Sequence, residues 1–157
     1  MKLIIAGSRN LRVSYNFIKS KFVFFEIPLD HVDEIVTGKA HGIDFCGEQF
    51  AIKERIPHKG FPYKPGLGRA GGPVRNREMA EYVKGRGALL LIWDGVSKGS
   101  ASMKFEAKRL FIPVFEVILH RPKQAEMKNL GIYKDPKDRV SEVNRSNTKD
   151  QHPGAIL

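Results

Sequence analysis

Four short segments of the chain bring together glycine, serine, arginine and aspartate, which are residue types that hold phosphorylated ligands. They are residues 7–9 (Gly-Ser-Arg), 38–44 (Gly-Lys-Ala-His-Gly-Ile-Asp), 75–78 (Arg-Asn-Arg-Glu) and 94–100 (Asp-Gly-Val-Ser-Lys-Gly-Ser). Glycine lets the backbone approach a ligand closely, and arginine grips a phosphate through two parallel hydrogen bonds. A carboxylate such as that of Asp94 accepts hydrogen bonds from ribose hydroxyls. These residue types therefore indicate a site for a sugar phosphate.

Apolar runs and amphipathic stretches alternate along the chain and must position these segments. The apolar runs predict strands over residues 2–6, 33–37, 57–61, 87–93 and 113–119. The amphipathic stretches predict helices that follow an N-cap at Ser14, surround residues 43–50, span residues 73–83, and begin near Ser100. In the last of these helices, the side chains expected to face the core are Met103, Ala107, Leu110 and Phe111.

This alternation of strands and helices implies parallel strands joined by right-handed crossovers. We expect a single Rossmann-like, doubly wound α/β domain with a mainly parallel five-stranded sheet over residues 1–119. Residues 120–157 are polar and basic, and we expect a C-terminal extension that is partly ordered at best. In open parallel sheets, ligands bind beyond the carboxyl ends of the strands, and the four segments are predicted to share that edge.

Twelve residues of these segments are predicted to contact the ligand. They are Gly7, Ser8, Arg9, Gly38, His41, Gly42, Asp44, Arg75, Asn76, Asp94, Gly99 and Ser100. Three of them have structural alternatives: Gly7 can be only a turn former, Asp44 can stabilise the start of its helix, and His41 can be a polar loop residue. Glu78 is a candidate general acid or base, with first-turn helix stabilisation as its alternative.

Composition restricts the classes of function. The formal net charge of +10 favours phosphates and polyanions, although a solvated basic surface is an equal alternative. A single cysteine, Cys46, allows no internal disulfide and fits a cytoplasmic protein. No apolar run approaches the length of a membrane span. The histidines lack metal-ligand spacing, and neither a P-loop nor Gly-x-Gly-x-x-Gly follows the first strand, so we expect neither a metal nor a cofactor.

The four segments, in this order, resemble the YspA-related (cpYpsA-related) branch of the SLOG superfamily. That superfamily also contains the Lonely Guy phosphoribohydrolases and the DprA/Smf DNA-processing proteins. The resemblance covers residues 1–119 and implies a Rossmann-like fold with a site for nucleotides or their derivatives. In the Lonely Guy branch an arginine and a glutamate assist cleavage of the base–ribose bond, and their nearest equivalents here are Arg75 and Glu78. Residues 94–100 replace the Pro-Gly-Gly-x-Gly-Thr loop of that branch, which favours binding over hydrolysis.

Three functions follow as expectations. The first is a sensor or sequestering protein for a nucleotide or a nucleotide-derived ligand, either phosphoribose or ADP-ribose-like. The second is an N-glycosidase, a hydrolase that acts on a nucleoside monophosphate with Glu78 and Arg75 as catalytic residues. The third is DprA-like binding of nucleic acid. Homo-oligomers are common among the related proteins, so the resemblance also implies a homodimer.

Overall fold

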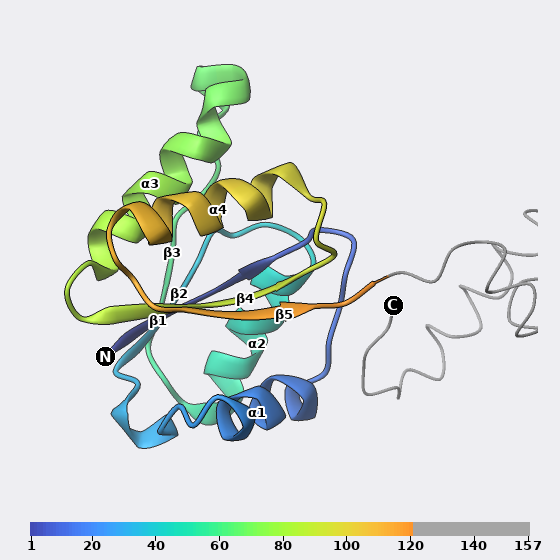
Figure 1. Cartoon of the computed structure of the whole chain (residues 1–157), viewed down its shortest axis with the longest axis vertical. Coiled ribbons are helices and arrows are strands. Elements are labelled where there is room, and N and C mark those ends of the chain that lie inside the picture. Colours follow the sequence, from blue (N-terminus) through green and yellow to red (C-terminus); the bar gives the residue numbers. More distant parts are fainter. Residues whose placement is uncertain (121–157) are drawn as a thin grey trace, which may run out of the picture.

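Five apolar runs form a single sheet in which every neighbouring pair of strands is parallel. The computed structural model describes residues 1–120, so the predicted extension lies, from residue 121 on, outside the described residues. The strand order is β3-β2-β1-β4-β5 (Figure 1). The strands are β1 (Lys2–Gly7), β2 (Glu34–Thr37), β3 (His58–Gly60), β4 (Gly87–Trp93) and β5 (Val114–Ile118). The predicted Rossmann-like α/β fold is therefore confirmed.

Helices cover both faces of this sheet. They are α1 (Tyr15–Phe24), α2 (Ile43–Glu54), α3 (Gly71–Val83) and α4 (Lys98–Arg109), with the short 3-10 helices η1 (Leu29–His31) and η2 (Pro65–Ala70). Figure 1 shows α1 and α2 on one face and α3 and α4 on the other. Ser14 is the N-cap of α1, as predicted, and its hydroxyl accepts a hydrogen bond from the Phe17 amide at 3.0 Å. Among residues 1–120, no helix combines the length and apolarity needed to cross a membrane.

Successive residues of the central strands point to opposite faces of the sheet and pack into two separate hydrophobic cores. In β1, Leu3 and Ile5 pack against α1 and α2, whereas Ile4 and Ala6 pack on the side of α3 and α4. Strand β4 alternates in the same way, and its interior residues are fully buried. Strands that are apolar on both faces are typical of a parallel sheet covered by helices on both sides.

The structure corrects three details of the sequence prediction. Helix α3 begins at Gly71 rather than at residue 73, and α4 begins at Lys98 rather than near Ser100. Phe111 was predicted to face the core but is 93% exposed. The reason is that α4 ends at Arg109 and Phe111 adopts a left-handed conformation with φ of 57°. This turn brings the next residue, Ile112, into the core instead.

Candidate ligand-binding site

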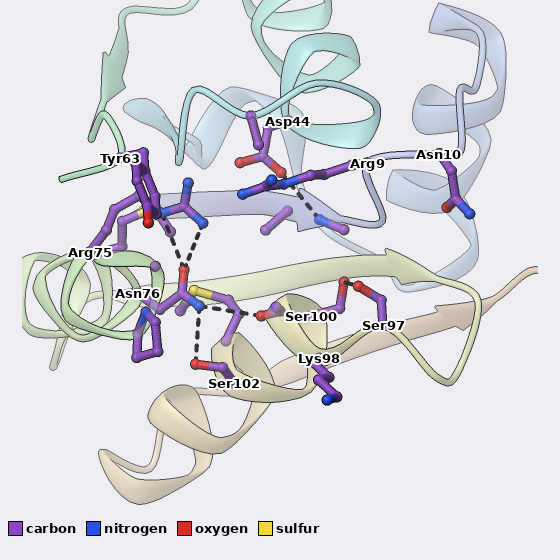
Figure 2. A pocket seen from close by; sticks show the side chains of 18 of the residues that line it. Arg9, Asn10, Asp44, Tyr63, Arg75, Asn76, Ser97, Lys98, Ser100 and Ser102 are labelled. Atoms are coloured by element: carbon purple, nitrogen blue, oxygen red, sulfur yellow. Dashed lines mark hydrogen bonds between the residues drawn. The ribbon is translucent and has the colours of Figure 1, made fainter. Parts of the chain in front are cut away.

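A cavity of about 680 Å³ opens at the carboxyl ends of the strands (Figure 2). It lies where the chain, after building β1, β2 and β3 outward in one direction, returns to place β4 on the other side of β1. Ligands of open α/β sheets bind at this kind of reversal. The polar residues that line the cavity are Arg9, Asn10, Asp44, Tyr63, Arg69, Arg75, Asn76, Asp94, Ser97, Lys98, Ser100 and Ser102.

The charged side chains of the cavity have a positive balance. The lining contains four cationic side chains and two carboxylates, which gives a formal charge of 4 − 2, or +2. The cations are Arg9, Arg69, Arg75 and Lys98, and the carboxylates are Asp44 and Asp94. The side chains of Arg9, Arg69 and Lys98 form no hydrogen bond or ion pair with any other residue of the described part of the chain. Cations that lack a protein partner in a concave site attract and concentrate anions there.

Arg75 is the buried cation of the site, with an exposed fraction of 7%. Its Nη1 donates to the Gly38 carbonyl at 2.8 Å, and its Nη2 donates to Asn76 Oδ1 at 3.2 Å. Burial lowers the pKa of Arg75, and the nearby Asp44 carboxylate opposes that effect. The guanidinium is therefore fixed by its partners before any ligand arrives.

Asn76 connects this guanidinium to helix α4. Its side-chain amide donates to the Gly99 carbonyl and to Ser102 Oγ, each at 3.2 Å. Asn76 is 2% exposed, so it makes these two hydrogen bonds, and accepts two more from Arg75, from a buried position beside the cavity. Arg75 and the first turn of α4 are consequently held in one arrangement.

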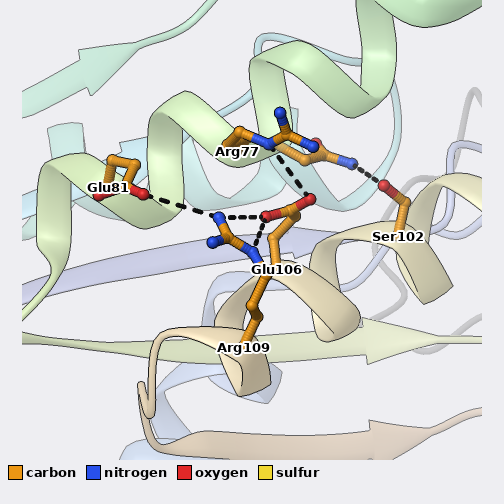
Figure 3. Close-up of polar contacts among 6 residues, drawn as sticks. Arg77, Glu81, Ser102, Glu106 and Arg109 are labelled. Atoms are coloured by element: carbon orange, nitrogen blue, oxygen red, sulfur yellow. Dashed lines mark hydrogen bonds and ion pairs between the residues drawn. The ribbon is translucent and has the colours of Figure 1, made fainter.

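A buried carboxylate continues this link between α3 and α4 (Figure 3). The side chain of Glu106 is 5% exposed and accepts two hydrogen bonds from Arg109, at 2.9 and 2.8 Å. Arg77 Nε lies 3.6 Å from the other carboxylate oxygen. Arg77 belongs to α3, so its ion pair with Glu106 joins the two helices, whereas the hydrogen bonds from Arg109 lie within α4.

Removing the charge of Glu106 is expected to weaken both the Arg109 hydrogen bonds within α4 and the Arg77 ion pair between α3 and α4. Glu106→Gln should lower the free energy of unfolding by about 2 kcal/mol, because the buried carboxylate accepts charge-assisted hydrogen bonds. The matched control is Glu81→Gln, since Glu81 lies 3.6 Å from Arg109 and is 49% exposed. An exposed pair of this kind should change the stability by less than about 0.5 kcal/mol. Urea unfolding measures both, and equal losses would contradict the prediction.

Asp44 joins the loops that follow β1 and β2. Its two carboxylate oxygens accept hydrogen bonds from the Gly7 amide at 3.3 Å and from the Gly38 amide at 2.8 Å. Desolvation raises the pKa of Asp44 to about 6, although Arg75 and the amide donors favour the ionised form. Asp44 therefore braces the wall of the cavity as well as lining it.

This raised pKa predicts a dependence of stability on pH. Because the folded protein holds the proton more tightly than the unfolded chain, Asp44 contributes stability below about pH 4 that is lost as the pH rises to about 6. Relative to Asp44→Asn, the wild-type protein should lose about 3 kcal/mol of unfolding free energy over that window. Urea unfolding of both proteins between about pH 4 and about pH 7 measures this difference. A difference that does not vary with pH would show that Asp44 titrates normally.

The first turn of α4 lines the cavity on the side opposite Asp44. Asp94 Oδ1 accepts hydrogen bonds from the amides of Val96 at 3.0 Å and Ser97 at 2.8 Å. Partial burial raises the pKa of Asp94, but these hydrogen bonds outweigh it and the net pKa is lowered, so the carboxylate stays ionised. Ser97 is the N-cap of α4 and makes no side-chain hydrogen bond to the backbone of the first turn. The amides of that turn are oriented to attract an anion.

Most residues predicted from the sequence do line the cavity. Those that line it are Gly7, Arg9, Asp44, Arg75, Asn76, Asp94, Gly99 and Ser100. Three others lie behind its wall: Ser8, Gly38 and Gly42 are all buried. Ser8 accepts a hydrogen bond from the Asp94 amide at 3.1 Å and so supports the site from within.

Two predicted residues lie outside the lining of the cavity. His41 is exposed and is not among the lining residues. Glu78 pairs with Lys64 at 3.2 Å, and its side chain is 42% exposed. Glu78 lies one helical turn beyond Arg75 on α3 but, unlike Arg75, does not line the cavity.

Several lining residues were not selected from the sequence. Ser97 and Lys98 belong to the predicted segment 94–100, whereas Arg69 follows Gly66 and Gly68 in η2 and belongs to none of the four segments. Tyr63 carried no local signal. Within the described residues, no three histidine, cysteine, aspartate or glutamate side chains gather into a group that could hold a metal ion.

The fold and the cavity are the available guides to function, and a fold by itself does not define one. Comparison of the chain with protein families, curated proteins and solved structures found no match.

Proposed function

We propose that the protein binds a nucleotide or a nucleotide-derived ligand, phosphoribose or ADP-ribose-like, and acts as a sensor or sequestering protein. The observation that carries the proposal is the convergence of Arg9, Arg69 and Lys98, each without a described partner, on one cavity that also receives the start of α4. A volume of about 680 Å³ suits a ligand of this size. The ionised Asp94 supplies an acceptor for ribose hydroxyls.

The position of Glu78 favours binding over hydrolysis. A general acid or base must lie within hydrogen-bond reach of the reacting group. Glu78 instead pairs with Lys64 and does not line the cavity. Two carboxylates do line it. Asp44 has a pKa of about 6, but both of its oxygens accept hydrogen bonds from backbone amides. The pKa of Asp94 is lowered, which does not suit a proton donor.

Thermal-shift measurements test the proposal directly. The probes are adenosine 5′-monophosphate, ADP-ribose, NAD and cyclic AMP, and adenosine without phosphate is the control. A probe present at about 100 times its Kd should stabilise the protein by about 2.7 kcal/mol, which raises Tm by about 5–10 °C. No shift with any phosphorylated probe, or an equal shift with adenosine, would contradict the proposal. Mass spectrometry of small molecules that copurify with the protein provides an independent test.

A further inference from the structure

Residues 63–70, which we call the hood, lie in the chain between β3 and α3, and two of them, Tyr63 and Arg69, line the cavity. Figure 1 shows η2, the main part of the hood, projecting beyond the rest of the domain. The hood is held at its base and at its tip. Lys64 forms an ion pair with Glu78 at 3.2 Å, and its carbonyl accepts a hydrogen bond from the Leu67 amide at 3.1 Å. The Tyr63 hydroxyl donates to the carbonyl of Gly68.

The ring of Tyr63 is placed by two glycines at the start of α3. A Cβ atom on Gly71 would lie 3.0 Å from Tyr63 Cζ, and one on Gly72 would lie 4.0 Å from Tyr63 Cε2. The ring therefore packs against backbone that carries no side chain. Tyr63 is nevertheless 41% exposed and lines the cavity, so part of a fixed aromatic ring is open to a ligand.

Tyr63 and the start of α4, whose amides attract an anion, lie at opposite ends of the cavity. In Figure 2, Tyr63 and Arg75 lie at one end, and Ser97 and Lys98 lie at the other. A ligand that uses both ends must carry a flat apolar group at one end and an anionic group at the other. A nucleoside phosphate has this form, whereas a sugar phosphate alone would leave the ring of Tyr63 uncovered.

We propose that Tyr63 is the platform on which the base of a nucleoside monophosphate stacks, and that it makes the site prefer this ligand to the bare sugar phosphate. The inference rests on the proposed function, because it assigns one end of the same cavity. Stacking of a base on an aromatic side chain typically changes the affinity by about tenfold or more. In this arrangement the hydroxyl of Tyr63 stabilises the hood through its hydrogen bond to Gly68, and the ring stacks on the base.

Isothermal titration with two probes separates these roles. Adenosine 5′-monophosphate carries the base, and ribose 5-phosphate lacks it. Tyr63→Leu should weaken binding of the first probe about tenfold and change binding of the second by less than about twofold. Tyr63→Phe keeps the ring and should stay within about threefold of the wild type for both probes. The control is Phe105→Leu, since Phe105 is 63% exposed and does not line the cavity.

The outcomes distinguish this inference from the function on which it rests. If Tyr63→Leu weakens both probes equally, or if Tyr63→Phe matches Tyr63→Leu, the residue acts only through the hood and the inference fails while the function stands. If the wild-type protein binds both probes equally well, the inference also fails. If it binds neither probe, the function and the inference fail together. A thermal unfolding curve for each variant confirms that it is folded.

Discussion

Gly7→Ala is expected to destabilise the protein by about 3 kcal/mol, the upper end of the usual cost of overpacking, because the new Cβ would meet backbone that cannot move aside easily. Gly7 ends β1 and pairs with Ile92 of β4. A Cβ atom there would lie 1.8 Å from the Ile92 carbonyl oxygen and 2.9 Å from Ile43 Cβ. The strands would have to separate, and the hydrogen bond from the Ser8 amide to the same carbonyl, at 3.2 Å, would be strained.

A second glycine provides the matched control. No atom lies within 4 Å of a Cβ built on Gly66, so Gly66→Ala should change the stability by less than about 0.5 kcal/mol. Urea unfolding without ligand compares the two variants under the same conditions. If Gly7→Ala proved as stable as Gly66→Ala, the close approach of β1 and β4 at this point would be wrong.

Arg9→Met is expected to weaken binding of adenosine 5′-monophosphate by about 10–100-fold, because a charge-assisted hydrogen bond to phosphate typically contributes about 1.5–3 kcal/mol. Arg9 lines the cavity, is exposed, and has no hydrogen-bond or ion-pair partner for its side chain within residues 1–120. Its removal should therefore change the free energy of unfolding by less than about 0.5 kcal/mol. Isothermal titration and urea unfolding measure the two effects separately.

Arg86→Met removes the same charge far from the cavity. Arg86 is exposed and directly precedes β4, so it lies at the amino-terminal end of the strands, whereas the cavity lies at their carboxyl ends. Its loss should reduce the affinity by less than about twofold, because exposed charges at that distance are screened by salt. Equal losses for Arg9→Met and Arg86→Met would mean that the net charge of the protein, rather than this cavity, attracts the ligand.

The fold was readable from the sequence because its signals are local. Apolar runs, such as the one at residues 87–93, predicted every strand to within one residue at each end. Helix boundaries were less accurate. Gly71 and Gly72 are poor helix formers and yet begin α3, where tertiary contacts override intrinsic propensity. The position of Phe111 depended on a left-handed turn, which periodicity does not reveal.

The site was predicted less completely because its parts serve different purposes. Arginine and aspartate after strands indicated a polar edge, and Arg9, Arg75 and Asp94 do meet there. The sequence did not show whether a polar residue would face the ligand or support the residues that do, and Ser8 turned out to be a buried support. The sequence did not indicate Tyr63, because its position depends on the hydrogen bond from its hydroxyl to the Gly68 carbonyl and on its packing against Gly71 and Gly72.

The cavity is lined by two parts of the chain that the pairing of β1 with β4 brings together. Arg9 and Asp44 come from the part that contains β1 and α2, and Arg75 and Lys98 come from the part that contains α3 and α4. Neither part can enclose a ligand without the other. Ligand binding and the stability of the β1–β4 pairing are therefore thermodynamically linked. A bound ligand stabilises the pairing of the two strands, and a change that weakens the pairing lowers the affinity for the ligand.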